Sequence, residues 1–155
     1  MQALNVLFLC TGNSCRSQMA EGWARHLKGE RFDAYSAGVK PSGLNQDAVR
    51  VMAEAGVDIS GQPSKHVDDL SSTHFDYVIT VCDDARESCP VFPGRAKVIH
   101  RSFDDPPRLA QNARTEAERL APYRRVRDEI REFISTLPEG LTGGATDNTV
   151  NKEDT

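Results

Sequence analysis

The chain has 155 residues, of which 38% are hydrophobic and 27% are charged, which is the size and composition of one globular domain. Its formal net charge of −4 excludes a general attraction to nucleic acid or to anionic membranes, so an anion site needs a local concentration of positive charge. The apolar run Val6 to Leu9 is too short for a signal peptide or a transmembrane helix. We therefore expect a cytoplasmic monomer with neither nucleic acid nor membrane as a partner.

The first half of the chain alternates predicted strands and helices. Apolar residues with β-propensity predict a strand over residues 4–9, and apolar side chains at helical spacing predict a helix after the next loop. A second strand is predicted over 32–37 and a second helix over 45–55. Asn45 is placed to cap this second helix and Gly56 to end it.

The second half continues the alternation with longer segments. Residues rich in Tyr, Val, Ile and Thr predict a strand over 75–82, and a shorter strand is predicted over 96–100. An apolar stripe predicts a long helix over 114–137. Pro122 is expected to kink or split this helix, because proline removes a backbone donor and its ring clashes with the preceding turn.

Four strands that alternate with helices predict an α/β fold in which a four-stranded parallel sheet carries helices on both faces. The predicted domain spans residues 1–137, and the polar, glycine-containing residues 138–155 are expected to form a disordered tail. Ligands of such sheets bind beyond the carboxyl ends of the strands. Cys10, Cys82 and the segment after His100 all fall at this edge.

The clearest motif joins the first strand to the first helix. Cys10 ends the strand and Arg16 opens the helix, and the five residues between them are Thr11, Gly12, Asn13, Ser14 and Cys15. A loop of this length can wrap its N–H groups around a tetrahedral oxyanion, while Arg16 binds two of the oxygens. The C-x5-R spacing alone arises easily by chance, so its position between a strand and a helix carries the argument.

This loop is also expected to activate its own nucleophile. The helix N-terminus and Arg16 should lower the pKa of Cys10 and favour the thiolate, to which Ser17 is placed to donate a hydrogen bond. Gly12 and Asn13 are expected to take left-handed backbone conformations that turn N–H groups inward. Cys15 is interpreted as a small packing residue that lines the loop.

The loop from Cys10 to Ser17, the strand before it and a later Asp-Pro at Asp105 resemble the low-molecular-weight protein tyrosine phosphatase family, which includes arsenate reductases of the same fold. The resemblance covers about residues 4–137. It implies that Cys10 attacks a tetrahedral anion and that Asp105 protonates the leaving group. Without the resemblance, Asp105 and its neighbour Asp104 read equally well as solvated loop carboxylates.

A second pair of cysteines separates the branches of this family. Cys82 ends a predicted strand and Cys89 follows seven residues later, an arrangement that resembles the thioredoxin-coupled arsenate reductases. That resemblance implies reduction of arsenate to arsenite, with a disulfide that passes from Cys10–Cys82 to Cys82–Cys89 and is reduced by thioredoxin, without a tightly bound cofactor. Two inert buried thiols and a zinc site are the alternatives, although C-x4-C and C-x6-C are unusual spacings for zinc.

The residues around the predicted site favour a small inorganic anion. Pro107 and Arg108 stand where phosphatases of the family often carry an aromatic residue, and Gly43-Leu44 supplies no bulky aromatic rim. Arsenate is therefore the expected substrate, and phosphate or sulfate can occupy the same loop. A low-molecular-weight protein tyrosine phosphatase is the first alternative function, and a non-catalytic oxyanion sensor or redox switch is the second.

Some reductases of this type hold a potassium ion beside the anion loop. Asn13, Glu21 and Ser36 match three of the ligand positions, but Lys65 stands where an aspartate is expected. The lysine ammonium can replace the ion there, so we expect no metal.

Overall fold

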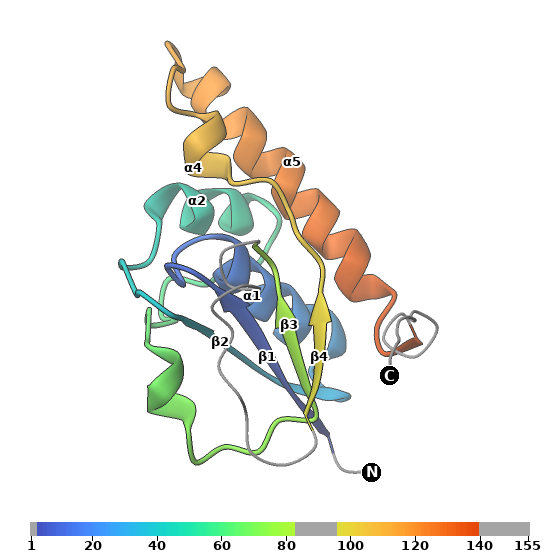
Figure 1. The fold of residues 1–155 in the computed structure, drawn as a ribbon. Helices are drawn as coiled ribbons and strands as arrows, with labels where there is room; N and C mark the ends of the chain where they lie inside the picture. Colours follow the sequence, from blue (N-terminus) through green and yellow to red (C-terminus); the bar gives the residue numbers. More distant parts are fainter. Residues whose placement is uncertain (1–2, 83–95, 140–155) are drawn as a thin grey trace.

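The structure is a computed structural model that describes residues 3–82 and 96–139. Its centre is a four-stranded parallel sheet, as the sequence predicted, and the strand order is β2-β1-β3-β4 (Figure 1). The strands are β1 (Leu4–Cys10), β2 (Phe32–Gly38), β3 (Tyr77–Thr80) and β4 (Lys97–His100). The helices are α1 (Arg16–Lys28), α2 (Gln46–Glu54), the 3-10 helix η1 (Val67–Leu70), the short α4 (Pro106–Leu109) and α5 (Glu116–Ser135).

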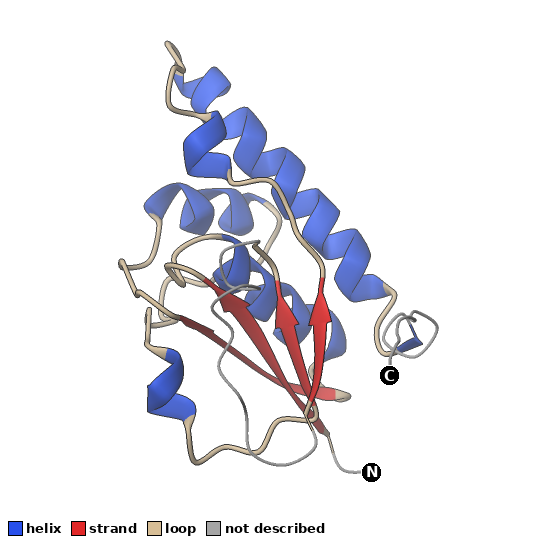
Figure 2. Ribbon diagram, viewed as in Figure 1, coloured by secondary structure: helices blue, strands red, loops and turns tan. Residues whose placement is uncertain are grey.

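The register of the sheet brings the ends of its strands to one edge. Cys10 pairs with Gly38, and Thr80 of β3 lies between Leu9 and His100 in the neighbouring strands. The arrowheads of β1, β3 and β4 accordingly point the same way, toward the part of the molecule where α2 lies (Figure 2). The convergence predicted at the carboxyl ends of the strands is thus confirmed for the described residues.

β3 is shorter than the predicted strand over 75–82, although its hydrogen bonding continues on both sides. Asp76 N–H donates to Asn5 at 2.8 Å, and Val81 N–H donates to Leu9 at 2.9 Å. These bonds extend the ladder toward Cys82 beyond the regular strand. The segment from β3 to β4 lies largely outside the described residues.

The hydrophobic core lies between the sheet and the helices α1 and α5. Leu7, Phe8 and Leu9 of β1 are fully buried, because this strand is central in the sheet and covered on its faces. Helix α5 contributes the apolar stripe that the sequence predicted, with Leu120, Tyr123, Val126, Ile130 and Ile134 buried. None of the helices in the described ranges has the length and apolarity that a membrane span requires.

Pro122 does not split α5, contrary to one half of the prediction. The helix continues from Glu116 to Ser135 with the proline inside it. Leu120 and Tyr123 on either side are buried, at 1% and 3% exposure, so tertiary packing holds this turn despite the missing backbone donor. The caps predicted for α2 are confirmed, since Asn45 accepts from Ala48 N–H at 2.9 Å and Gly56 follows the helix with φ 87°.

A row of ion pairs fastens α2 to α5. Each pair joins an arginine to a carboxylate across the seam: Arg50 to Glu116 (2.7 Å), Arg119 to Asp47 (3.0 Å) and Arg124 to Glu54 (2.8 Å). Every one of these arginines donates through two nitrogens, which fixes the geometry of each pair. Ion pairs between solvent-exposed side chains stabilise a fold little, so these pairs orient α2 and α5 relative to each other more than they hold them together.

Truncation of a buried side chain on α5 should lower the free energy of unfolding substantially. We expect Ile130→Ala, at a fully buried position, to lower the free energy of unfolding in urea by about 2–5 kcal/mol, because it removes buried methyl groups and leaves a cavity. Leu27→Ala is the matched control, because Leu27 is 36% exposed and should cost well under half as much. Equal losses at both positions would contradict the assignment of α5 to the core.

Candidate anion-binding active site

The carbonyl groups of residues 11–14 point away from the centre of the loop between β1 and α1. Their hydrogen-bond donors are Lys40 N–H for Thr11 (2.8 Å), Ser42 N–H for Gly12 (2.9 Å), the Gln18 side-chain amide for Asn13 (3.0 Å) and Asn45 N–H for Ser14 (2.9 Å). These peptide bonds are trans, so each N–H points opposite to its carbonyl. The N–H groups of residues 12–15 therefore face the interior that the loop encloses.

These four N–H groups are free to bind a ligand. Within the described residues, none of them donates a hydrogen bond to another part of the chain. Buried N–H groups left without an acceptor are rare in folded proteins, and several that converge form a site for an oxyanion. The start of α1 adds its partial positive charge to the same place.

Asn13 provides the one left-handed residue that the loop needs. Its φ is 47°, and its side chain stabilises this conformation by accepting from Lys65 N–H at 2.9 Å and donating to the Ser17 hydroxyl at 2.9 Å. Gly12 does not share the conformation, so the prediction of two left-handed residues is confirmed for Asn13 only. Ser17 accepts from Asn13, and no contact of its hydroxyl with Cys10 is found, whereas the sequence predicted a hydrogen bond to that sulfur.

Arg16 and Asp105 meet beside this loop. Arg16 donates through Nη1 to the Phe103 carbonyl at 2.9 Å, and its Nη2 lies 3.6 Å from Asp105 Oδ1. The Nε of Arg16 is buried and has no partner among the described residues, so it remains available to an anion. Asp104 turns away and pairs with Arg125 at 3.0 Å, which leaves Asp105 as the carboxylate at the site.

Cys82 lies against both Cys10 and the loop. Its sulfur accepts from Thr11 N–H at 3.2 Å, and the Cys82 and Cys10 side chains are 3% and 4% exposed. The hydrogen bond with Cys82 and then burial raise the pKa of Cys10 well above its usual value, while Arg16 acts in the opposite direction. The low pKa expected from the sequence is therefore wrong for this arrangement, because the neighbouring thiol outweighs the arginine.

Of the two remaining cysteines, only Cys15 lies within the described residues. Cys15 is buried in the core, and burial raises its pKa, in keeping with its interpretation as a packing residue. Cys89 lies outside the described residues.

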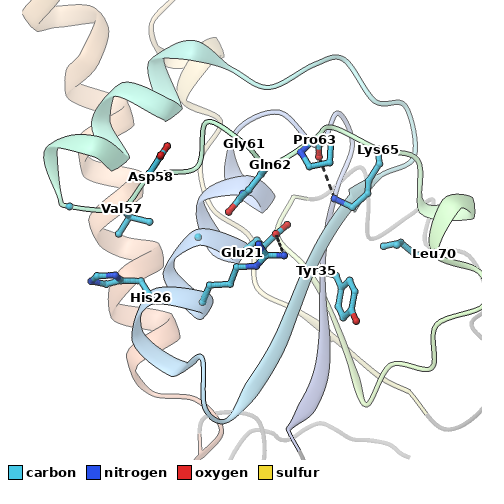
Figure 3. Close-up of a pocket in the computed structure, with 13 residues that line it drawn as sticks. Glu21, His26, Tyr35, Val57, Asp58, Gly61, Gln62, Pro63, Lys65 and Leu70 are labelled. Atoms are coloured by element: carbon cyan, nitrogen blue, oxygen red, sulfur yellow. Dashed lines mark hydrogen bonds and ion pairs between the residues drawn. The ribbon is translucent and has the colours of Figure 1, made fainter.

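A second cluster of charges lies behind the loop, in a groove of about 750 Å³ between α1, β2 and residues 56–65 (Figure 3). Glu21 is 2% exposed, accepts from the Ser36 hydroxyl at 2.6 Å and pairs with Arg25 at 2.7 Å. Lys65 reaches into the groove and donates to the Pro63 carbonyl at 3.3 Å; burial lowers its pKa, and Glu21 opposes that shift.

This cluster does not fit a bound cation. Arg25 already neutralises the buried Glu21, and Lys65 adds a second positive charge from the other side of the groove.

Sequence reasoning found the loop but missed the residues that orient it. The donors from residues 40–45 act through their backbone N–H groups, which every residue except proline carries and which no motif reveals. Gln18 alone gives a signal, because it is a polar residue on the fully buried side of α1, between Ser17 and Met19.

Gly38 closes the loop from behind. A Cβ at this position would lie 2.6 Å from the Thr11 carbonyl oxygen and 2.8 Å from Asn13 N, and both are backbone atoms that cannot give way without moving the loop. The end of β2 therefore needs a residue without a side chain here.

We expect Gly38→Ala to weaken binding of inorganic phosphate at least tenfold, because the added methyl group displaces the loop N–H groups from the positions that face the anion. Isothermal titration with phosphate measures this change. Gly61→Ala is the matched control, since a Cβ there meets nothing within 4 Å, and it should leave phosphate binding unchanged. Equal affinities in the two variants would contradict the role given to Gly38.

Removal of the Cys82 sulfur should lower the pKa of Cys10. Cys82→Ala eliminates the first cause of the raised pKa and leaves Arg16 in place, so the rate of Cys10 alkylation should rise at lower pH than in the parent. The pH profile of iodoacetamide labelling, followed by mass spectrometry of the peptide that contains Cys10, measures the shift. Cys10→Ser identifies the signal, and a profile that stays in place or moves to higher pH would count against the contact with Cys82.

Comparison with known proteins gives the following relatives. The model of the family "Low molecular weight phosphotyrosine protein phosphatase" matches residues 5–154. The arsenate reductase of Bacillus licheniformis is 49% identical over 139 residues, which cover 90% of this chain and 98% of that protein. Two solved structures, an arsenate reductase in the phosphate binding state and an arsenate reductase in oxidized state, superpose with TM-scores of 0.66 and 0.67, at 31% and 30% identity, and each match covers 86% of this chain and 95% of the other.

Proposed function

The chain belongs to the low molecular weight phosphotyrosine protein phosphatase family, as one of its arsenate reductases, and we propose that it reduces arsenate to arsenite with electrons from its own thiols. Cys10 is the nucleophile, Cys82 forms the first disulfide and Cys89 takes over that disulfide. Thioredoxin then restores the thiols. The observation that carries this proposal is the Cys82 sulfur, which lies beside Cys10 and within 3.2 Å of Thr11 N in the anion loop.

In the first step the loop binds arsenate as it would bind phosphate. The inward N–H groups of residues 12–15 and the free Nε of Arg16 bind the oxygens, and the start of α1 favours the negative charge. The Cys10 thiolate attacks arsenic and forms a sulfur–arsenic bond. One arsenate oxygen leaves as water after Asp105 donates a proton to it, and Arg16 holds that carboxyl 3.6 Å from its guanidinium.

In the second step the arsenic accepts two electrons. The Cys82 thiolate attacks the Cys10 sulfur, a disulfide forms between the two, and the sulfur–arsenic bond breaks with its electron pair on arsenic. Arsenic leaves as arsenite, so two thiols have been oxidised to one disulfide and As(V) has been reduced to As(III). The packing of Cys82 against Cys10 supports this step, because the two sulfurs meet without a large movement of either strand end.

In the third step the disulfide moves away from the loop. Cys89 attacks Cys82 and releases the Cys10 thiol for another turnover, while the Cys82–Cys89 disulfide becomes the substrate of thioredoxin. Cys89 lies outside the described residues, so its part rests on the sequence motif. Thioredoxin as the donor likewise rests on the resemblance of that motif.

A phosphatase reaction would use the same loop but leaves Cys82 without a purpose. Phosphate-ester hydrolysis needs only the nucleophile, Arg16 and an acid, and it needs the nucleophile as a thiolate. A second thiol beside Cys10 has no step to perform in such an enzyme. In a reductase Cys82 is the second of the two thiols that together supply two electrons to arsenic.

Turnover should depend on both partner cysteines. In an assay of arsenate-dependent NADPH oxidation with thioredoxin and thioredoxin reductase, we expect Cys82→Ser and Cys89→Ser each to lose at least a thousandfold in kcat, because each interrupts the path of the electrons. Phosphate should still bind to both variants with parental affinity. Cys15→Ser is the control cysteine variant and should retain turnover if it folds.

Two results would decide against parts of the scheme. Parental turnover in Cys82→Ser would refute the disulfide sequence as a whole. Turnover that occurs with glutaredoxin and glutathione, but not with thioredoxin, would replace the donor and leave the chemistry at Cys10 and Cys82 in place.

A further inference from the structure

Hydrogen bonds of Asn45 connect the loop to two helices. Its backbone N–H donates to the Ser14 carbonyl at 2.9 Å, and its side-chain oxygen accepts from Ala48 N–H at 2.9 Å as the cap of α2. Its side-chain nitrogen donates to the hydroxyl oxygen of Tyr123 on α5 at 3.2 Å. One residue thus joins the anion loop, the start of α2 and the side of α5.

The bond to Ser14 fixes the direction of one of the four inward N–H groups. When the Ser14 carbonyl points at Asn45, the N–H of Cys15 in the same peptide plane points into the loop. Among the residues that donate to the loop carbonyls through their backbone N–H, Asn45 is the one whose side chain is hydrogen-bonded to a buried tyrosine hydroxyl. The orientation of the Cys15 N–H therefore depends on Asn45 and, through Asn45, on Tyr123.

Tyr123, whose hydroxyl accepts from Asn45, packs in the hydrophobic core. It is 3% exposed and lies on the buried stripe of α5, while its hydroxyl reaches Asn45 near the loop. Burial raises the pKa of Tyr123, and the hydrogen bond from Asn45 acts in the opposite direction, so the hydroxyl stays neutral. A phenylalanine would fill the same space without the oxygen.

The same turn of α5 also reaches the loop that carries the acid. Arg125, two residues beyond Tyr123, pairs with Asp104 at 3.0 Å, next to Asp105. In Figure 1 α5 passes beside both α2 and α4, the two helices whose N-terminal caps are Asn45 and Asp105. This part of α5 thus supports the two segments between which the anion binds.

We propose that Tyr123 is a positioning residue of the active site, whose hydroxyl holds Asn45 and thereby the Ser14–Cys15 peptide in the orientation that binds an oxyanion. Tyr123 contacts neither the anion nor the reacting sulfurs and acts only through Asn45. The inference concerns oxyanion binding, and it rests on the proposed function only where arsenate is the oxyanion.

The test removes the hydroxyl and measures how well inorganic phosphate protects Cys10 from iodoacetamide. In Tyr123→Phe we expect the phosphate concentration for half-protection to rise about three- to tenfold, since one hydrogen bond that orients a binding N–H is lost. Asn45→Ser keeps a side-chain oxygen to cap α2 but removes the amide that reaches Tyr123, and it should show a similar rise. The double variant should need no more phosphate for half-protection than the single variant that needs more, because both substitutions break the same hydrogen bond.

A purely structural role for Tyr123 predicts a different pattern. Tyr123→Phe would then lower the melting temperature and leave phosphate protection unchanged, and that result would overturn the proposal. Tyr77→Phe is the matched control, because Tyr77 lies at the opposite end of β3 from the loop and should change neither protection nor turnover.

Arsenate kinetics give a second readout. KM for arsenate should rise by the same factor as the half-protection concentration, with kcat changed less than twofold. Protection of the parent by phosphate without any arsenate turnover would refute the proposed reductase function, and the phosphate comparison of the variants would still decide the role of Tyr123.

Discussion

The hydrogen bonds that hold the loop carbonyls outward are the constraint on which this site depends. An acidic chain has no general attraction for an anion. The loop can bind one mainly because its N–H groups are directed at the same point, and less because of the charge of the chain. Once Lys40, Ser42, Gln18 and Asn45 bind the carbonyls, the N–H groups of residues 12–15 have nowhere to point but inward. Gly38 and the left-handed Asn13 are consequences of the same demand, because the backbone must turn tightly and pass close to β2. The preorganised N–H groups then need no rearrangement when the anion binds.

The sulfur pair adds a second constraint that a phosphatase does not have. The parallel register pairs Thr80 with Leu9, so Cys82, two residues beyond β3, lies beside the start of the loop, where its sulfur accepts from Thr11 N–H and contacts Cys10. In the proposed scheme the proximity of Cys82 suits formation of a disulfide with Cys10, but the same contact raises the pKa of Cys10. Arg16 and the loop N–H groups act against that effect, so the reactivity of Cys10 is a balance between a neighbour that hinders ionisation and a cation that favours it.

The sequence was sufficient for the sheet, the loop and the meeting of Cys10, Arg16, Cys82 and Asp105, because strand periodicity and motif spacing are local signals that parallel topology then brings together. It was insufficient where the outcome depends on a balance of nonlocal contacts. The pKa of Cys10 depends on Cys82, 72 positions away by their numbers, and Ser17 is bonded to Asn13 instead of the sulfur. Pro122 remains inside α5 because its buried neighbours outweigh its local preference. Backbone donors such as Asn45 N–H leave no trace in a side-chain pattern.

The raised pKa of Cys10 also bears on how the enzyme survives oxidising conditions. Peroxide attacks thiolates far faster than thiols, and oxidation beyond the sulfenic acid is irreversible for most proteins. Cys10 is 4% exposed and Cys82 raises its pKa, so burial and the raised pKa both reduce the thiolate that such oxidants can reach. A sulfenic acid on Cys10 would lie beside the Cys82 thiol, which can condense with it to a disulfide and release water; in the proposed scheme this is the disulfide that is later reduced. The contact that slows the nucleophile therefore also shields it from permanent damage.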